Sequence, residues 1–140
     1  MANSFATEAV SVERVRVLRG RLSLLVRMAP GAPHDVSPGL LAAALERFPS
    51  LPFHACVNGS GPTFAAVMAS TSVPHLLEHL IIDAQARDAA TPADLILAGT
   101  TEWLDKEGGL ARVEVNFADD LAAFRALREA LAFVNKEMVG

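Results

Sequence analysis

The stretch that decides the fold is VERVRVLRGRLSLLVRM, residues 12–28, in which apolar and polar side chains alternate over two short runs. Valines alternate with arginines in 12–18, and four apolar side chains share one side of 21–28. A period of two residues is typical of a strand with one buried face. Because only Arg19 and Gly20 separate the two runs, we predict an antiparallel hairpin.

Three further segments carry apolar side chains at the spacing of a helix. The first covers 38–48, and the second begins after Ser72 and runs to about residue 89. Both start with a serine followed within two residues by a proline, which is typical of a helix N-terminus. The third begins after Asp119 and is predicted to be amphipathic. Its apolar stripe consists of Leu121, Phe124, Leu127, Leu131 and Val134.

The remaining apolar runs are predicted to be strands. They cover 63–69, 93–99 and 110–117, and in the last of these Val113, Val115 and Phe117 are expected to point inward. The order of elements is then ββαβαββα, without a repeat or a linker. Hairpins and short connections favour an antiparallel sheet. We therefore predict one α+β domain over residues 1–140, with two layers, a mostly antiparallel sheet and the helices on one face.

Composition excludes several classes of protein. The 140 residues are 51% hydrophobic and 20% charged, with a formal net charge of −4. Without a basic surplus, binding to nucleic acid is not expected. The single cysteine, Cys56, excludes an intrachain disulfide and a cysteine-cluster metal site. No apolar run approaches ~18 residues, so no membrane span is expected. The start lacks the pattern of a secretory signal, which favours a cytoplasmic protein.

The second predicted helix carries the sequence HLLEH, residues 75–79, which has the H-x-x-E-H form of inverted zinc peptidases. His75 and His79 project from one side, one turn apart, and could hold one zinc ion. Glu78 lies beside them and could act as the base that takes a proton from water. The simpler interpretation is a solvated helix face. Because Ile82 and Ala86 share this face, we expect it to border a cleft instead.

A catalytic zinc ion takes three protein ligands, so a third ligand is needed besides the two histidines. Asp83 lies one turn beyond His79 and is expected to orient a histidine ring rather than to bind metal. Glu114 is expected on the solvent side of its strand. We therefore favour Glu102, which follows the strand predicted over 93–99.

The segment 49–62, PSLPFHACVNGSGP, is a long irregular loop, and such loops are often functional. His54 and Cys56 within it could line the metal cleft or touch a substrate. The ordinary alternative is a loop histidine beside a small buried thiol.

Four segments together resemble the N-terminal domain of cyanophycin synthetase: PGLLAAALERFPSLPFHAC, HLLEHLIIDAQ, AGTTEW and ARVEVNFADD. The similarity spans residues 38–135. That family polymerises aspartate and arginine, and its N-terminal domain binds the polymer and in some members cuts it at a metal site. The resemblance implies that His75 and His79 are ligands, Glu78 the base and Glu102 the matching glutamate. Asp83 and Thr101 depart from the family, which tends to have glutamate and arginine there.

Two functions remain after this comparison. The first is a zinc-dependent hydrolase of peptide or isopeptide bonds, with a peptide or an Asp/Arg-containing polymer as substrate. The alternative is a non-catalytic module that binds a charged peptide or polymer and has a vestigial or structural metal site. Because the chain has no Gly-rich phosphate loop, it is not expected to be a synthetase. A lyase of the S-ribosylhomocysteine type would need a cysteine, and Cys56 is the only candidate. A homo-oligomer is compatible with either function.

Overall fold

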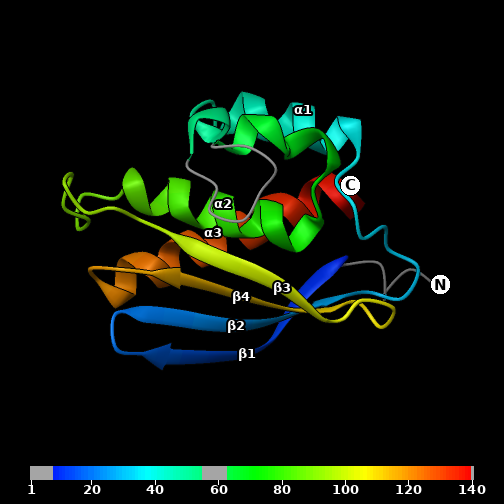
Figure 1. Cartoon of the computed structure of the whole chain (residues 1–140), viewed down its shortest axis with the longest axis horizontal. Helices are drawn as coiled ribbons and strands as arrows, with labels where there is room; N and C mark the ends of the chain where they lie inside the picture. The colour runs from blue at the N-terminus through cyan, green and yellow to red at the C-terminus, as the bar shows by residue number, and fades with distance from the viewer. Residues whose placement is uncertain (1–7, 55–62, 140) are drawn as a thin grey trace.

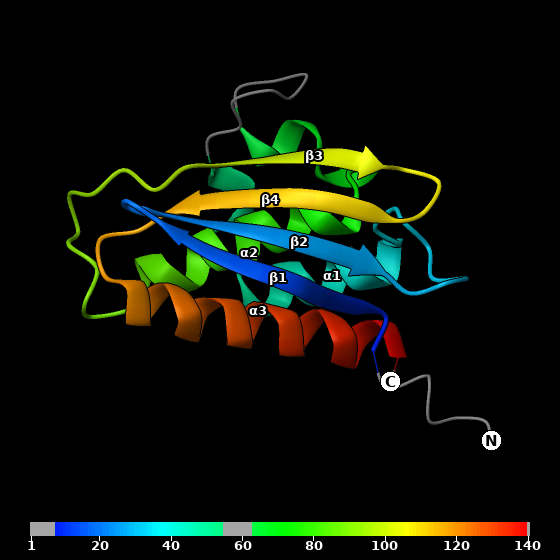
Figure 2. The same ribbon diagram turned by 90° about the horizontal axis from the view of Figure 1, so that it is seen from below.

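The computed structural model describes residues 8–54 and 63–139, which form a four-stranded antiparallel sheet with helices on one of its faces. The strands follow the order β1-β2-β4-β3 across the sheet. Figure 2 shows the helices labelled α1 and α2 behind the sheet and the C-terminal helix α3 along its β1 edge. The predicted α+β class with helices on one face is confirmed. The strands are β1 (Val10–Leu18), β2 (Arg21–Met28), β3 (Gly99–Asp105) and β4 (Leu110–Asn116).

The helices differ in how close they lie to the sheet. The two that contact it are α2 (Val73–Ala86) and α3 (Asp120–Val139). Helix α1 (Pro38–Arg47) packs on α3 on the side away from the sheet (Figure 1). Each N-terminus is capped as predicted, by Ser37, Ser72 or Asp119, whose side-chain oxygen accepts a backbone N–H three residues later. Among the described helices, none is both long and apolar enough to cross a membrane.

The hairpin that opens the sequence forms as predicted. Gly20 has a φ of 69°, a conformation that a residue without a Cβ adopts at little cost, and it closes the turn between β1 and β2. The apolar side of β2 is fully buried under the helices, as the alternation in the sequence indicated. Its members are Leu22, Leu24, Val26 and Met28.

The register between β3 and β4 decides which β3 side chains face the helices. Thr101 is opposite Val113, which is buried, and Glu102 is opposite Arg112. Residues directly opposite one another in an antiparallel pair share a face of the sheet. Thr101 therefore points toward α2, whereas Glu102 points to the other face of the sheet.

Three predictions about local structure are wrong. Residues 63–69 do not form a strand but two 3₁₀ turns, η3 (Phe64–Ala66) and η4 (Met68–Ser70), and only Phe64 among them is buried. Residues 93–98 are irregular, and β3 begins at Gly99, where pairing with β4 starts. In the predicted apolar stripe of α3, Leu121 is 63% exposed, because it lies on the side of the helix opposite the buried Ala123, Ala126 and Ala130.

Candidate metal centre

Helix α2 is enclosed on nearly every side, so even its polar side chains are buried. Leu76, Leu77, Leu80 and Ile81 are completely buried in the core between α2, α3 and the sheet. On another side of the same helix, His75, Glu78 and His79 each offer one ligand atom, and these atoms all lie within 4.8 Å of one another. The spacing of three and four residues places them on adjacent turns. This His–Glu–His group could hold a metal ion.

The imidazole of His79 is the most enclosed member of the group. Its residue is 1% exposed, and its Nε2 atom is buried without a hydrogen-bond partner among the described residues. Burial, reinforced by the neighbouring His75 and His54, lowers the pKa of His79 to about 3. The ring is therefore neutral at physiological pH, which is the form that binds a metal ion. A buried nitrogen with no hydrogen-bond partner among the described residues is a suitable ligand atom for a metal ion.

The carboxyl group of Glu78 is held beside this nitrogen. Its Oε1 atom accepts a 2.7 Å hydrogen bond from the hydroxyl of Thr101, and its Oε2 atom lies 3.8 Å from His79 Nε2. The residue is 4% exposed, and burial raises the pKa of Glu78 to about 7 although the Thr101 hydrogen bond lowers it. Gly99 leaves the room for this carboxyl, since a Cβ there would lie 3.0 Å from Oε2.

The third member, His75, is half-buried at the start of α2. Its Nδ1 atom is 2.5 Å from the hydroxyl oxygen of the buried Thr71, within hydrogen-bond distance. Burial lowers the pKa of His75 as well. The completely buried Phe64 ring stands edge-on to His75 and lies against His79, with ring centroids 5.5 and 4.3 Å apart. Phe64 thus forms an apolar wall beside both imidazoles.

The two residues expected near the metal, His54 and Asp83, are linked to His79 in a chain of contacts. The Nδ1 atoms of His54 and His79 are 3.1 Å apart, and His54 Nε2 is 3.2 Å from Asp83 Oδ1. Asp83 also accepts hydrogen bonds from Ser50 and from Arg87. Burial by itself raises the pKa of Asp83, but hydrogen bonds from His54, Ser50 and Arg87 lower it overall. Asp83 is thus an ionised acceptor at neutral pH.

The structure does not bring Glu102 to the histidines. Its side chain is 61% exposed and pairs with Arg112 at 3.2 Å on the face of the sheet opposite α2. Glu114 lies on that same face, where it accepts a hydrogen bond from Ser23 and pairs with Arg21. Cys56, the remaining sequence candidate, lies outside the described residues. Among the described residues, the donor that joins His75 and His79 is therefore Glu78.

Sequence reasoning missed the residues that hold these donors in place. Thr71, Phe64 and Ser50 carry no recognisable pattern, because each meets α2 only in the folded chain. Gly99 and Thr101 lie in the quoted segment AGTTEW, whose glycine and threonines were the signal available. Their closeness to Glu78 was not predicted, because it depends on the pairing of β3 with β4 in the folded chain.

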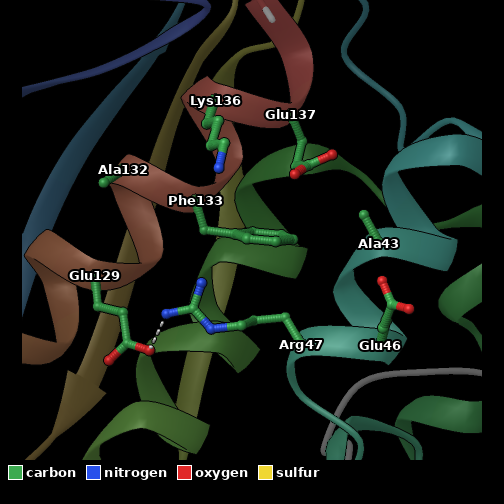
Figure 3. A pocket seen from close by; sticks show the side chains of 8 residues that line it. All are labelled: Ala43, Glu46, Arg47, Glu129, Ala132, Phe133, Lys136 and Glu137. Carbon is green, nitrogen blue, oxygen red and sulfur yellow. Dashed lines mark hydrogen bonds and ion pairs between the residues drawn. The ribbon is translucent and has the colours of Figure 1, made fainter.

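Two pockets help to place the centre in the molecule. An apolar pocket of about 200 Å³ borders His54, and its other lining residues are Ile82, Ala86, Leu95 and Leu97. The sequence predicted that the face carrying His75, Glu78 and His79 borders a cleft; Ile82 and Ala86 line this pocket, but none of those three residues does. A larger pocket of about 410 Å³ lies between α1 and α3, where Arg47 reaches across to pair with Glu129 (Figure 3). None of the His–Glu–His group lines that larger pocket.

No protein-family model matches the chain, and no curated protein matches it.

Proposed function

We propose that this protein is a zinc-dependent hydrolase of peptide or isopeptide bonds whose metal is held by His75, Glu78 and His79. The observation that carries the proposal is that the three donors lie within 4.8 Å of one another, beside a buried Nε2 atom of His79 that has no hydrogen-bond partner in the described part of the chain. A buried polar atom left unpaired is costly, typically by about 1–3 kcal/mol. A metal ion at this position would satisfy it.

The donor set and its spacing suit zinc. Bonds of about 2.0–2.1 Å at tetrahedral angles place two ligand atoms about 3.4 Å apart, close to the 3.8 Å between His79 Nε2 and Glu78 Oε2. Glu78 thus takes the ligand role that the sequence suggested for Glu102. Two histidines and one glutamate are the ligands of several catalytic zinc sites, which keep a fourth position open.

A bound zinc ion would act as a Lewis acid toward a carbonyl oxygen and would lower the pKa of water to about 7. The protein's own contribution is to fix the donors. The Thr101 hydroxyl holds one carboxyl oxygen of Glu78 and leaves the other facing His79. Thr71 contacts one ring nitrogen of His75, and Phe64 keeps one side of both imidazoles apolar. Such fixed donors need little rearrangement during reaction.

The substrate class rests on the resemblance of residues 38–135 to the N-terminal domain of cyanophycin synthetase. A polymer that contains aspartate and arginine is accordingly the substrate that we propose to test first. An ordinary peptide serves as the comparison.

A second candidate function is a binding module with a structural metal ion. The observation that favours it is the burial of Glu78 and His79, which are 4% and 1% exposed. A substrate carbonyl must reach the open position on the metal, and in this conformation only His75 of the group is partly accessible.

The test compares zinc-loaded wild-type protein with Glu78→Gln and with Glu102→Gln, which makes the same chemical change at an exposed position. We expect wild-type protein and Glu102→Gln to bind zinc and cut the Asp/Arg polymer. Glu78→Gln should lose both properties. If it keeps zinc but loses cleavage, Glu78 is the base rather than a ligand. If wild-type protein binds zinc and cuts neither substrate, the hydrolase is refuted and the binding module is favoured.

A further inference from the structure

We propose that His54 and Asp83 are positioning residues that fix the tautomer of His79, so that its Nε2 atom presents a lone pair to the metal. The expected effect on metal binding rests on the proposed function, because it requires the zinc site. Its structural part, the position of one proton on His79, can be tested without any metal.

The direction of the hydrogen bonds follows from what each group can donate. Asp83 is an ionised acceptor, so the proton shared with it at 3.2 Å belongs to Nε2 of His54. In a neutral His54 the other nitrogen, Nδ1, then carries a lone pair. Because this atom is 3.1 Å from His79 Nδ1, the proton between the two rings must come from His79. Nε2 of His79 is left without a proton.

The opposite arrangement is unfavourable on the same geometry. If Nδ1 of His54 donated the hydrogen bond, His79 would accept it and carry its own proton on Nε2. That N–H group would be buried, and the nearest carboxyl oxygen, Glu78 Oε2, is 3.8 Å away. This distance is too long for a hydrogen bond. The reversed arrangement would also place a proton where the metal must bind.

The surroundings of Asp83 keep this chain in one orientation. Ser50 and His54 flank the 3₁₀ turn η2 (Leu51–Phe53), whose Leu51 is completely buried, so one anchored turn brings both side chains to Asp83. Arg87 donates to the other oxygen of Asp83 at 3.2 Å and also pairs with Glu129 on α3. Asp83 thus has donors on both oxygens.

Asp83→Asn is the informative variant, because an amide has nearly the same shape but can donate as well as accept. The amide NH₂ group could donate to Nε2 of His54, which would reverse both hydrogen bonds and place a proton on Nε2 of His79. A similar exchange of a carboxylate for an amide is known to select the wrong histidine tautomer in serine proteases. Loss of such supporting contacts typically weakens metal binding by about 10–100-fold.

The experiment is long-range ¹H–¹⁵N NMR of the histidine rings in metal-free protein, combined with zinc titration. It is run well above the ordinary histidine pKa of about 6.5. Asp88→Asn is the matched control, since Asp88 follows α2 but pairs with Arg125 rather than with a histidine. We expect the Nδ1–H tautomer at His79 in wild-type protein and in Asp88→Asn. In Asp83→Asn the signal should move toward the Nε2–H tautomer, with zinc binding about 10–100-fold weaker.

An Nε2–H tautomer at His79 in wild-type protein would overturn the inference, and this result needs no variant. Equal zinc affinity of Asp83→Asn and Asp88→Asn would also overturn it. If Asp83→Asn does not fold, the wild-type tautomer decides the question. Wild-type protein that shows the expected tautomer but binds no zinc would refute the proposed function while leaving the tautomer assignment intact.

Discussion

In metal-free protein, Glu78→Gln should remove a pH-dependent penalty that the wild-type fold carries. The Glu78 carboxyl is buried, and its pKa is raised from an ordinary 4.5 to about 7. Glutamine has the shape of the protonated carboxylic acid and never ionises. We therefore expect the variant to be as stable as wild-type protein at low pH and more stable at high pH.

The magnitude follows from the two pKa values. Below pH 4.5 the carboxyl is protonated in both the folded and the unfolded chain, so it imposes no penalty. As the pH rises from 4.5 to about 7, only the unfolded chain releases the proton, and the free energy of unfolding falls. At about 1.4 kcal/mol for each pH unit, the full loss is about 3 kcal/mol. The variant should therefore gain about 3 kcal/mol over wild-type protein above pH 7.

The other buried member of the group acts in the opposite direction. Because the pKa of His79 is lowered from 6.5 to about 3, its contribution to stability is lost as the pH falls through this range. His79 is present in both proteins, so its contribution largely cancels in the difference between them.

The assay is urea unfolding across a pH series in the presence of a chelator, followed by circular dichroism and by the fluorescence of Trp103, the only tryptophan. Glu102→Gln is the matched control, because it makes the same chemical change at an exposed position on the other face of the sheet. A difference for Glu78→Gln that is flat across pH 4.5–8, or a variant less stable than wild-type protein at pH 8, would refute the reasoning.

Two other variants test how Glu78 is held. Gly99→Ala would place a Cβ 2.5 Å from the Glu114 carbonyl oxygen and 3.0 Å from Glu78 Oε2. It should lower the free energy of unfolding by about 1–3 kcal/mol and weaken zinc binding, as urea unfolding and zinc titration would show. Gly39→Ala is the control, because nothing lies within 4 Å of the new Cβ, and it should change neither stability nor zinc binding in this way. Equal losses in Gly99→Ala and Gly39→Ala would contradict the packing argument. Thr101→Val removes the hydroxyl that lowers the pKa of Glu78, so the pH midpoint of the Glu78 penalty should rise. Thr101→Ser keeps a hydroxyl, so its pH midpoint should equal that of wild-type protein. An unchanged midpoint in Thr101→Val would show that the hydrogen bond does not lower the pKa of Glu78.

The elements best predicted from the sequence are those with local signals. The hairpin was predicted from the alternation of apolar and polar side chains and from Gly20 in its turn, and each helix start was predicted from a capping residue such as Ser72. The run at 63–69 is as apolar as a strand, but it pairs with none of the four described strands and forms 3₁₀ turns that bury only Phe64. A short apolar run does not reveal whether a partner strand exists.

The same limit explains the candidate site. The H-x-x-E-H spacing sufficed to predict that His75, Glu78 and His79 share one side of a helix, because that depends on helix geometry alone. Glu102 was misplaced because the strand was predicted over 93–99, which made this residue a strand end. Once β3 is paired with β4, Glu102 is inside the strand and its side chain leaves α2. The link between His54 and His79 depends on tertiary packing and has no sequence signal beyond the two residue types.

The most direct test of the central claim is the amount of zinc bound per chain, measured by native mass spectrometry after loading at neutral pH and removal of free metal. The comparison is between wild-type protein, His79→Ala and His34→Ala, whose side chain contacts Trp103 outside the His–Glu–His group. We expect one zinc ion in wild-type protein and in His34→Ala, and none in a folded His79→Ala. Absence of zinc from wild-type protein, or equal zinc in His79→Ala, would contradict it.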